Sequence, residues 1–163
     1  MNKFKSFLIL FISFILQTSI FAKIDILGAN INIIIPVTIA LSQVLPTKTG
    51  RVGGLVVGLI EDFLFASLIG VRALSYYLIG LFSSGQILKV SKNKETGFII
   101  SLIATLFNFL LVSAIYYVFG KSMVPIRSYL GIPLFVEALL NSFIYFLYYL
   151  LIKKIMYIPT YRI

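Results

Sequence analysis

The chain has 163 residues, of which 60% are hydrophobic and only 12% are charged. Soluble globular domains carry about 25% charged residues, and a domain of this size buries only about 70% of the surface that its unfolded chain exposes. A water-soluble fold could therefore not hide this much apolar surface. The composition excludes soluble enzymes, disordered tails and nucleic-acid-binding proteins, and it indicates an integral membrane protein despite the net charge of +9.

The sequence also contains no histidine and no cysteine. This excludes a histidine-based triad, imidazole and thiolate metal ligands, disulfides and the common zinc and iron–sulfur sites. Carboxylates, hydroxyls, lysine and tyrosine are the side chains left for catalysis, and the carboxylates are few. We expect neither a metal nor another cofactor.

Six apolar segments are predicted to cross the bilayer as helices, because about 20 mainly apolar residues span its ~30 Å hydrocarbon core. The predicted spans cover residues 7–21, 26–45, 52–70, 75–90, 97–119 and 133–152. A tight turn near 70–75 is expected, because one helix over residues 52–90 would be about 58 Å long. Nothing marks a second domain, so residues 1–163 are predicted to form one all-α, polytopic membrane domain.

Lysine and arginine in the short connections predict the orientation, because they are enriched on the cytoplasmic side of membrane proteins. With both termini in the cytoplasm, ten of the 14 basic residues lie inside: Lys3, Lys5, Lys48, Arg51, Lys89, Lys92, Lys94, Lys153, Lys154 and Arg162. The four that lie outside are Lys23, Arg72, Lys121 and Arg127. The basic inner loops are also expected to contact anionic lipid.

The first span has a second interpretation, because a basic start followed by a short apolar run is also typical of a signal peptide. Cleavage after Ala22 would place Ile20 at a position that prefers a small residue, so an uncleaved helix is favoured. Cleavage would leave five spans and an outer N-terminus.

The third span carries a regular series of small residues. Every fourth position contributes to it: Gly50, Gly54, Gly58, Asp62, Ala66 and Gly70. On an α-helix this spacing traces one ridge, and in lipid small residues let another backbone approach closely. The ridge predicts a packing groove that is filled by another helix of this chain or by a partner.

Asp62 interrupts this ridge near the predicted middle of the membrane, and Glu61 lies beside it. A carboxylate at such a depth costs about 2.5–3.5 kcal/mol on insertion scales, so it is expected to face a partner group. Three interpretations stay open. The carboxyl group locks two helices together, it binds a partner or ligand, or it takes part in proton-coupled transport.

The sixth span carries a polar stripe on an otherwise apolar helix. Glu137, Asn141, Tyr145 and Tyr149 repeat every four residues, although the tyrosines could also form an interfacial belt. Asn141 and Asp62 are expected at similar depths. We therefore predict that the third and sixth helices pack together, with Asp62 near Asn141.

Enzymatic activity is not expected. An intramembrane aspartyl hydrolase needs two neighbouring carboxylates, but the only aspartates are Asp62 and Asp25, which is predicted at the outer edge. A small lipoprotein-signal-peptidase-like enzyme would need the same pair. A Ser–Lys dyad is also disfavoured, because every lysine is predicted at a helix end or in a loop.

The segment Gly58–Gly85 resembles the signature of the MreD family of rod-shape-determining membrane proteins, in which a glycine-spaced helix ends in Gly-Leu-x-x-Asp and an Ala-Leu-x-Tyr-x-x-x-Gly segment follows. The matching residues are Gly54, Gly58, Leu59, Asp62, Gly70, Ala73, Leu74, Tyr76, Gly80 and Gly85. Glu137 and Asn141 resemble the family's last helix, and Gln17 also fits. The family often has Pro-Asp before its second helix, whereas this chain has Asn30 and Asn32 there.

The resemblance implies a non-catalytic scaffold of the bacterial elongation machinery in the cytoplasmic membrane. Its implied partners are an MreC-like bitopic protein, an MreB-like actin homologue and peptidoglycan synthases. The resemblance also implies a helical arrangement akin to the substrate-binding subunits of energy-coupling-factor vitamin transporters, and such a subunit is the alternative function. Those subunits usually carry an Ala-x-x-x-Ala dock on the first helix, which here has only Ala22.

The residues expected to bind a partner or to organise the helix bundle follow from the ridge, the stripe and the resemblance. They are Gly54, Gly58, Asp62, Ala66, Gly70, Glu137 and Asn141.

Overall fold

The computed structural model describes residues 2–45, 48–85, 87, 89, 91–120 and 126–156, and most of these are helical. The elements are α1 (Asn2–Ser19), η1 (Phe21–Lys23), β1 (Asp25–Ile26), β2 (Ala29–Asn30), α2 (Ile34–Val44), α3 (Thr49–Phe65), α4 (Val71–Ser83), α5 (Lys94–Val118), α6 (Ile126–Tyr129) and α7 (Ile132–Ile155). The prediction of an all-α membrane protein is confirmed.

The six apolar helices differ in length more than the predicted spans do. By length and composition, α1 with η1, α5 and α7 are long enough to cross a membrane among the described residues. With 11 and 13 residues, α2 and α4 extend over only about 17 and 20 Å. The bounds predicted for the second and fourth spans therefore differ from those of α2 and α4, and the number of membrane crossings stays a prediction.

The second predicted span, 26–45, is too long because its first part is not helical. Asp25–Ile26 and Ala29–Asn30 pair as a short antiparallel hairpin, and α2 begins only at Ile34. Pro36 lies in the first turn of α2, where the amide hydrogen that proline lacks would have no intrahelical partner.

The turn between the third and fourth helices comes earlier than 70–75. α3 ends at Phe65 and α4 begins at Val71. Of the fourth predicted span, Gln86, Leu88 and Val90 lie outside the described residues, as do Lys121 and Arg162 of the orientation prediction.

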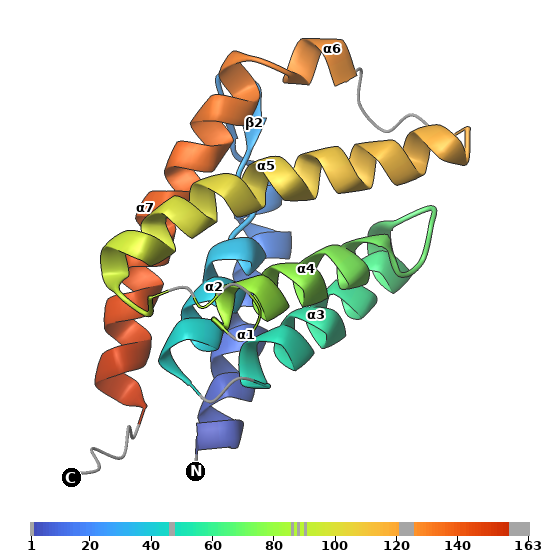
Figure 1. Ribbon diagram of the computed structural model, residues 1–163. Coiled ribbons are helices and arrows are strands. Elements are labelled where there is room, and N and C mark those ends of the chain that lie inside the picture. The colour runs from blue at the N-terminus through green and yellow to red at the C-terminus, as the bar shows by residue number, and fades with distance from the viewer. Residues whose placement is uncertain are drawn as a thin grey trace, which may run out of the picture.

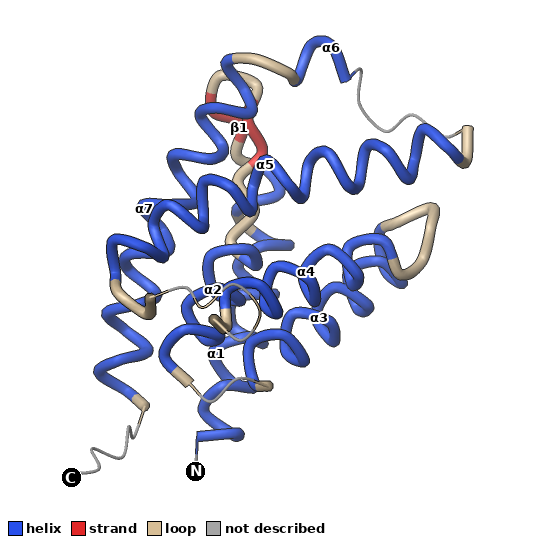
Figure 2. The backbone as a smooth tube through the Cα atoms, in the orientation of Figure 1, coloured by secondary structure: helices blue, strands red, loops and turns tan. Residues whose placement is uncertain are grey.

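α2 forms the centre of the molecule. Residues 34–43 are all buried, and α7, α3, α4 and α5 surround this helix. Its sequence is apolar on every side, which is typical of a helix that packs on all its faces. Figures 1 and 2 show α3 and α4 side by side as an antiparallel pair, with α5 crossing α7.

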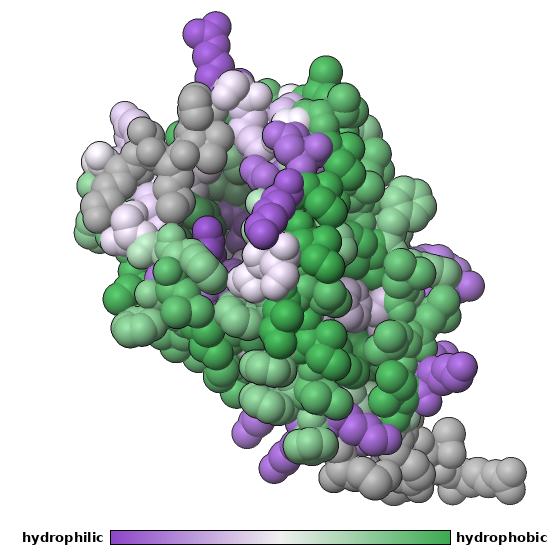
Figure 3. All heavy atoms as spheres, turned by 180° about the vertical axis from the view of Figure 1, so that it is seen from behind, coloured by the Kyte–Doolittle hydropathy of each residue, from purple (hydrophilic) through white to green (hydrophobic). Residues whose placement is uncertain are grey.

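The outer surface is suited to lipid. Large apolar side chains such as Phe7, Ile103, Leu110 and Phe143 are exposed. Figure 3 shows one face that is mostly hydrophobic in its lower half, with hydrophilic residues along its edges and in the middle of its upper half. Because apolar side chains are at no disadvantage in hydrocarbon, this surface is consistent with a bilayer as solvent.

The start of α1 and the end of α7 lie at the same end of the molecule, and the β-hairpin lies at the other (Figure 1). The side chain of Lys5 donates a hydrogen bond to the carbonyl oxygen of Ile155, at 2.8 Å. The start of α1 and the end of α7 therefore share one side, and the cytoplasmic location of that side stays a prediction.

The absence of native cysteine makes this orientation directly testable. Leu27, at the hairpin tip, is 71% exposed, and Lys3 lies near the opposite end. In intact cells, a membrane-impermeant thiol reagent is expected to label a Leu27→Cys variant and not a Lys3→Cys variant. Both variants should react after permeabilisation, and the reverse pattern in intact cells would contradict the predicted topology.

Candidate functional site

Asp62 joins the end of α3 to the start of α4. Its Oδ2 atom accepts hydrogen bonds from the backbone N–H groups of Gly70 at 2.9 Å, Arg72 at 2.9 Å and Ala73 at 3.2 Å. The first N–H groups of a helix have no partner within the helix, and a negative charge is favourable there. Asp62 is fully buried, and it therefore caps α4 from inside the protein.

The loop between these helices depends on Gly70, which has a φ of +98°. Nothing lies within 4 Å of a Cβ atom added at this position, so a larger side chain would have room. Glycine is favoured here because of the left-handed backbone conformation. Because α3 ends at Phe65, Ala66 and Gly70 lie beyond the helix, and their predicted place on the ridge is wrong. Asp62 likewise lies in the last turn of α3 rather than in the middle of a span.

The remaining ridge packs against this chain's own helices. A Cβ atom added at Gly58 would lie 2.6 Å from the Cα atom of Ala73 in α4. One added at Gly54 would lie 2.8 Å from Cγ2 of Thr38 in α2 and 3.1 Å from the carbonyl oxygen of Tyr76 in α4. α2 and α4 thus fill the groove that the spacing predicted.

The same close approach continues to the other end of the helix pair. A Cβ atom added at Gly80 in α4 would lie 2.5 Å from the Cα atom of Arg51 in α3. One added at Gly50 would lie 2.5 Å from the backbone nitrogen of Ser42 in α2. Small residues on both helices therefore allow α3 and α4 to touch along their length.

The predicted contact between Asp62 and Asn141 is wrong. α3 packs chiefly against α4, whereas α7 packs chiefly against α5 and α2. Asp62 has its hydrogen bonds at the start of α4, and its Oδ1 atom is buried without a partner among the described residues. The third and sixth predicted spans are not the packing pair that their polar residues suggested.

The neighbouring residue, Glu61, provides the connection to the polar stripe. The hydroxyl of Tyr76 donates to Glu61 Oε2 at 2.9 Å and accepts from Asn32 Nδ2 at 2.8 Å. The backbone N–H of Asn32 donates to Asn141 Oδ1 at 3.2 Å. Asn141 Nδ2 in turn donates to Thr105 Oγ1 at 3.1 Å. This polar chain links α3, α4, the segment before α2, α7 and α5.

The segment before α2 is held by side chains, because it has few backbone partners of its own. Gln17 Nε2 donates to the carbonyl oxygen of Ile31 at 3.0 Å, and the N–H of Ile33 donates to Gln17 Oε1 at 2.8 Å. Asn32 Oδ1 accepts from the N–H of Ile34, at 3.1 Å. These bonds satisfy the backbone at the start of a buried helix.

Glu137, at the other end of the stripe, ties α6 and the hairpin to α7. Its Oε2 atom accepts from the hydroxyl of Tyr129 at 2.7 Å, and that hydroxyl accepts from the N–H of Asn30 at 3.1 Å. Burial, together with the nearby Glu137, raises the pKa of Tyr129, so its hydroxyl keeps the proton that it donates.

The rest of the stripe also points inward. Tyr145 is fully buried, and its hydroxyl donates to Gln43 Oε1 in α2 at 2.6 Å. Tyr149 is 9% exposed. An interfacial belt is therefore the wrong interpretation of Tyr149, which belongs to the core together with Tyr145.

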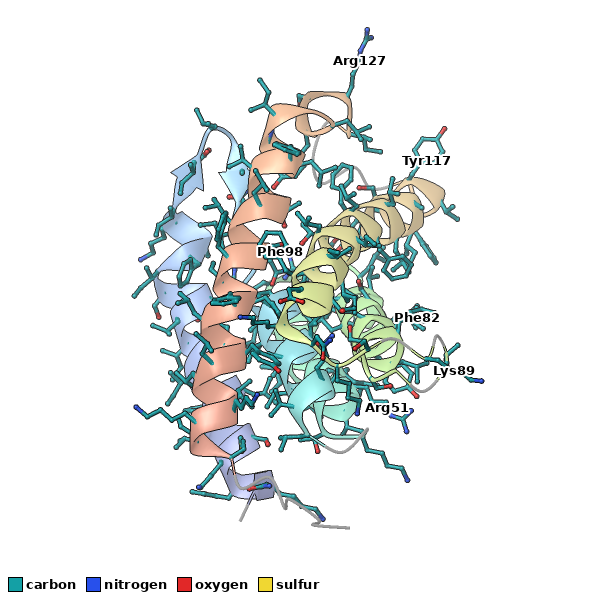
Figure 4. The ribbon with its side chains drawn as sticks, turned by 60° about the vertical axis from the view of Figure 1, so that its left-hand side comes forward. Arg51, Phe82, Lys89, Phe98, Tyr117 and Arg127 are labelled. Atoms are coloured by element: carbon teal, nitrogen blue, oxygen red, sulfur yellow. The ribbon has the colours of Figure 1, made fainter. Side chains whose placement is uncertain are left out.

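A cavity of about 560 Å³ lies next to this polar chain. Its walls come from the end of α1, the hairpin and the following segment, the adjoining ends of α3 and α4, the second half of α5, α6 and the start of α7. Tyr117, which lines it, lies toward the same end of the molecule as Arg127, whereas Arg51 and Lys89 lie toward the other end (Figure 4). The cavity is thus on the side that the predicted orientation places outside.

A model of the MreD family, described as rod shape-determining protein MreD, matches residues 1–156. The chain belongs to the MreD family. It is therefore a rod-shape-determining integral membrane protein, of the MreBCD rod-shape system. Comparisons with characterised proteins and with solved structures give no match, so the likeness to energy-coupling-factor subunits stays a prediction.

The MreD-like motif can now be interpreted physically. Gly58 is a point of close approach between α3 and α4, and Asp62, Gly70 and Ala73 together form the helix cap. Tyr76 carries the bond from Glu61 to Asn32. The motif thus describes one structural unit, the α3–α4 pair with its links to α2.

Two polar residues of this MreD-family chain have contacts that the sequence does not predict, Glu61 with Tyr76 and Gln43 with Tyr145. The position of Asn32 in an apolar segment indicates a hydrogen bond to another helix, and the structure has one, to Tyr76. A polar residue inside an apolar segment indicates a buried hydrogen bond, and this pattern could have identified Gln43 as it does Asn32.

Among the described residues, no group of three or more aspartates and glutamates could hold a metal ion.

The ridge predicts a difference between two alanine substitutions in the same helix. Gly58→Ala forces a methyl group against the backbone of α4 and is expected to destabilise the protein by about 1–3 kcal/mol. Gly53→Ala meets only the methyl end of the Leu10 side chain, which can move, so its cost should be smaller. Thermal denaturation of the purified protein in detergent measures both, and equal midpoints for the two variants would contradict this packing.

Proposed function

We propose that the protein is a non-catalytic scaffold of the bacterial elongation machinery, which supports lateral peptidoglycan synthesis from the cytoplasmic membrane. Membership of the MreD family carries the proposal. The geometry supports it, because Asp62, Glu61, Glu137 and Asn141 are bonded to other parts of the same bundle. Their role is to fix the relative positions of the helices and so to keep the outer surface constant.

The partner within the membrane is an MreC-like bitopic protein, whose single helix packs on an apolar face. Of the three longest apolar helices, α5 is the least buried, and it exposes Ile99, Ile103, Leu106 and Leu110. The same type of contact would recruit the peptidoglycan synthases. Because these residues make no polar contacts, shape complementarity of the fixed surface provides the selectivity.

The cytoplasmic partner is an MreB-like actin homologue. The basic residues Lys48, Lys89, Lys92 and Lys153 lie on the side of the chain ends in the predicted topology. There they would meet an acidic protein surface or anionic lipid, at about 1 kcal/mol per basic residue near the membrane.

The role of the helix cap gives a ranking of two substitutions. Asp62→Leu removes the acceptor of three backbone N–H groups and is expected to cause rod-shaped cells to become round. Glu61→Gln keeps an oxygen that can accept from Tyr76, so cells with this variant should stay rod-shaped. Microscopy of cells that depend on each variant tests the ranking.

Two further measurements make the result specific. Asp62→Asn keeps one side-chain oxygen as a capping acceptor and should give an intermediate phenotype. Co-purification of the MreC-like partner should fall with the same rank, at membrane protein levels matched by immunoblot. Wild-type shape and co-purification in Asp62→Leu would contradict the proposal. Growth that is restored by added vitamins, with normal shape, would instead favour the transporter-subunit alternative.

A further inference from the structure

The outer cavity has the size and lining of a small-molecule site. Its volume of about 560 Å³ falls within the ~300–1,000 Å³ that is usual for ligand pockets, and both aromatic and polar side chains line it. Phe109, one of the lining residues, stacks on Tyr129 with ring centroids 5.3 Å apart. The scaffold function uses the polar chain behind this cavity but not the cavity itself.

Most polar groups in the wall are already engaged. Glu61 accepts from Tyr76, and Glu137 accepts from Tyr129. Asn108 Oδ1 accepts from the hydroxyl of Ser75 at 2.7 Å. The two carboxylates are largely buried, although both also line the cavity.

Arg72 is the exception. Its side chain lines the cavity and is partly exposed, and its guanidinium group makes no hydrogen bond or ion pair with another residue that the structure describes. Arg72 lies in the first turn of α4, where the helix dipole disfavours a cation. Arg72 lies close enough to the buried Glu61 for their charges to attract. No hydrogen bond or ion pair joins the two side chains among the described residues, so the guanidinium donors remain available to an anion.

Asn108, on the α5 wall, adds a second donor. Its Oδ1 atom is used by Ser75, but its Nδ2 group donates to no other residue in the described part of the chain. The side chains of Phe109, Tyr116 and Phe65 supply apolar and aromatic surface next to these donors. The combination is suited to a flat organic body with one negatively charged end.

We propose that this cavity binds a small organic anion, with a carboxylate held by Arg72 and Asn108 and an aromatic or unsaturated body against the rings. The proposal does not depend on the scaffold function. A ligand of this class would reach the cavity from the outer side, and its binding would hold α5 near the start of α4.

The charge preference of the cavity can be measured with single cysteines, because the chain has none of its own. Ser113 lines the cavity, whereas Leu130 lies outside it and is 50% exposed. Purified full-length S113C and L130C variants in phosphatidylcholine vesicles are treated with a negatively charged and a positively charged methanethiosulfonate. The anionic-to-cationic rate ratio is expected to be about tenfold higher for S113C than for L130C.

Arg72→Gln in the S113C background should reduce this ratio to that of L130C. The substitution leaves the helix cap intact, because Asp62 accepts from the backbone of Arg72. An unchanged thermal midpoint verifies that the variant is folded. A ratio that does not respond to Arg72→Gln, or no modification of S113C by either reagent, would overturn the proposal.

Protection experiments then test the ligand class. Benzoate is expected to slow the anionic modification of S113C several-fold, and this protection should disappear with Arg72→Gln. Benzyl alcohol has the same ring without the charge and should not protect. Equal protection by the two compounds would overturn the proposal. Protection by phosphatidylglycerol in the vesicles but not by benzoate would assign the site to a lipid headgroup, and protection only by the MreC-like partner would assign it to a protein segment.

Discussion

Three backbone N–H groups at the start of α4 point toward one oxygen of Asp62, which lies at the end of α3. Hydrogen bonds to a charged group contribute about 1.5–3 kcal/mol each, and a backbone group left without a partner costs more where water is absent. This cap fixes the turn between two helices whose backbones are in close contact and which the bond between Tyr76 and Glu61 also joins. The left-handed conformation of Gly70 makes the turn possible.

Once this pair is fixed, the other polar contacts follow in order. Glu61 comes directly before Asp62 and reaches Tyr76 on the paired helix, and Tyr76 meets Asn32 at the start of α2. Asn32 reaches Asn141, which brings α7 and α5 into the same network. The buried side chains of Glu61, Tyr76 and Asn141 thus each have a partner on a different element, which specifies one arrangement of helices that apolar packing alone would leave less defined.

The central helix α2 shows why such a network is needed. It is too short to span a bilayer, so other helices must surround it, and the residues before it need partners for their backbone groups. Gln17 and Asn32 supply these partners. A β-hairpin and α6 close the end of the molecule opposite the start of α1, where the cavity with Arg72 opens beside them.

The sequence by itself determined that the chain is a helical membrane protein of the MreD family, because apolar composition and local spacing are properties of single segments. It also predicted that Gly54 and Gly58 line a groove and that Asn141 belongs to a polar stripe. Only the tertiary structure decided what meets these residues. Periodicity gives the face of a helix but not the partner across it, so Asp62 was wrongly paired with Asn141. In the structure Asp62 bonds to the start of α4, and the connection from α3 to α7 runs through Glu61, Tyr76 and Asn32.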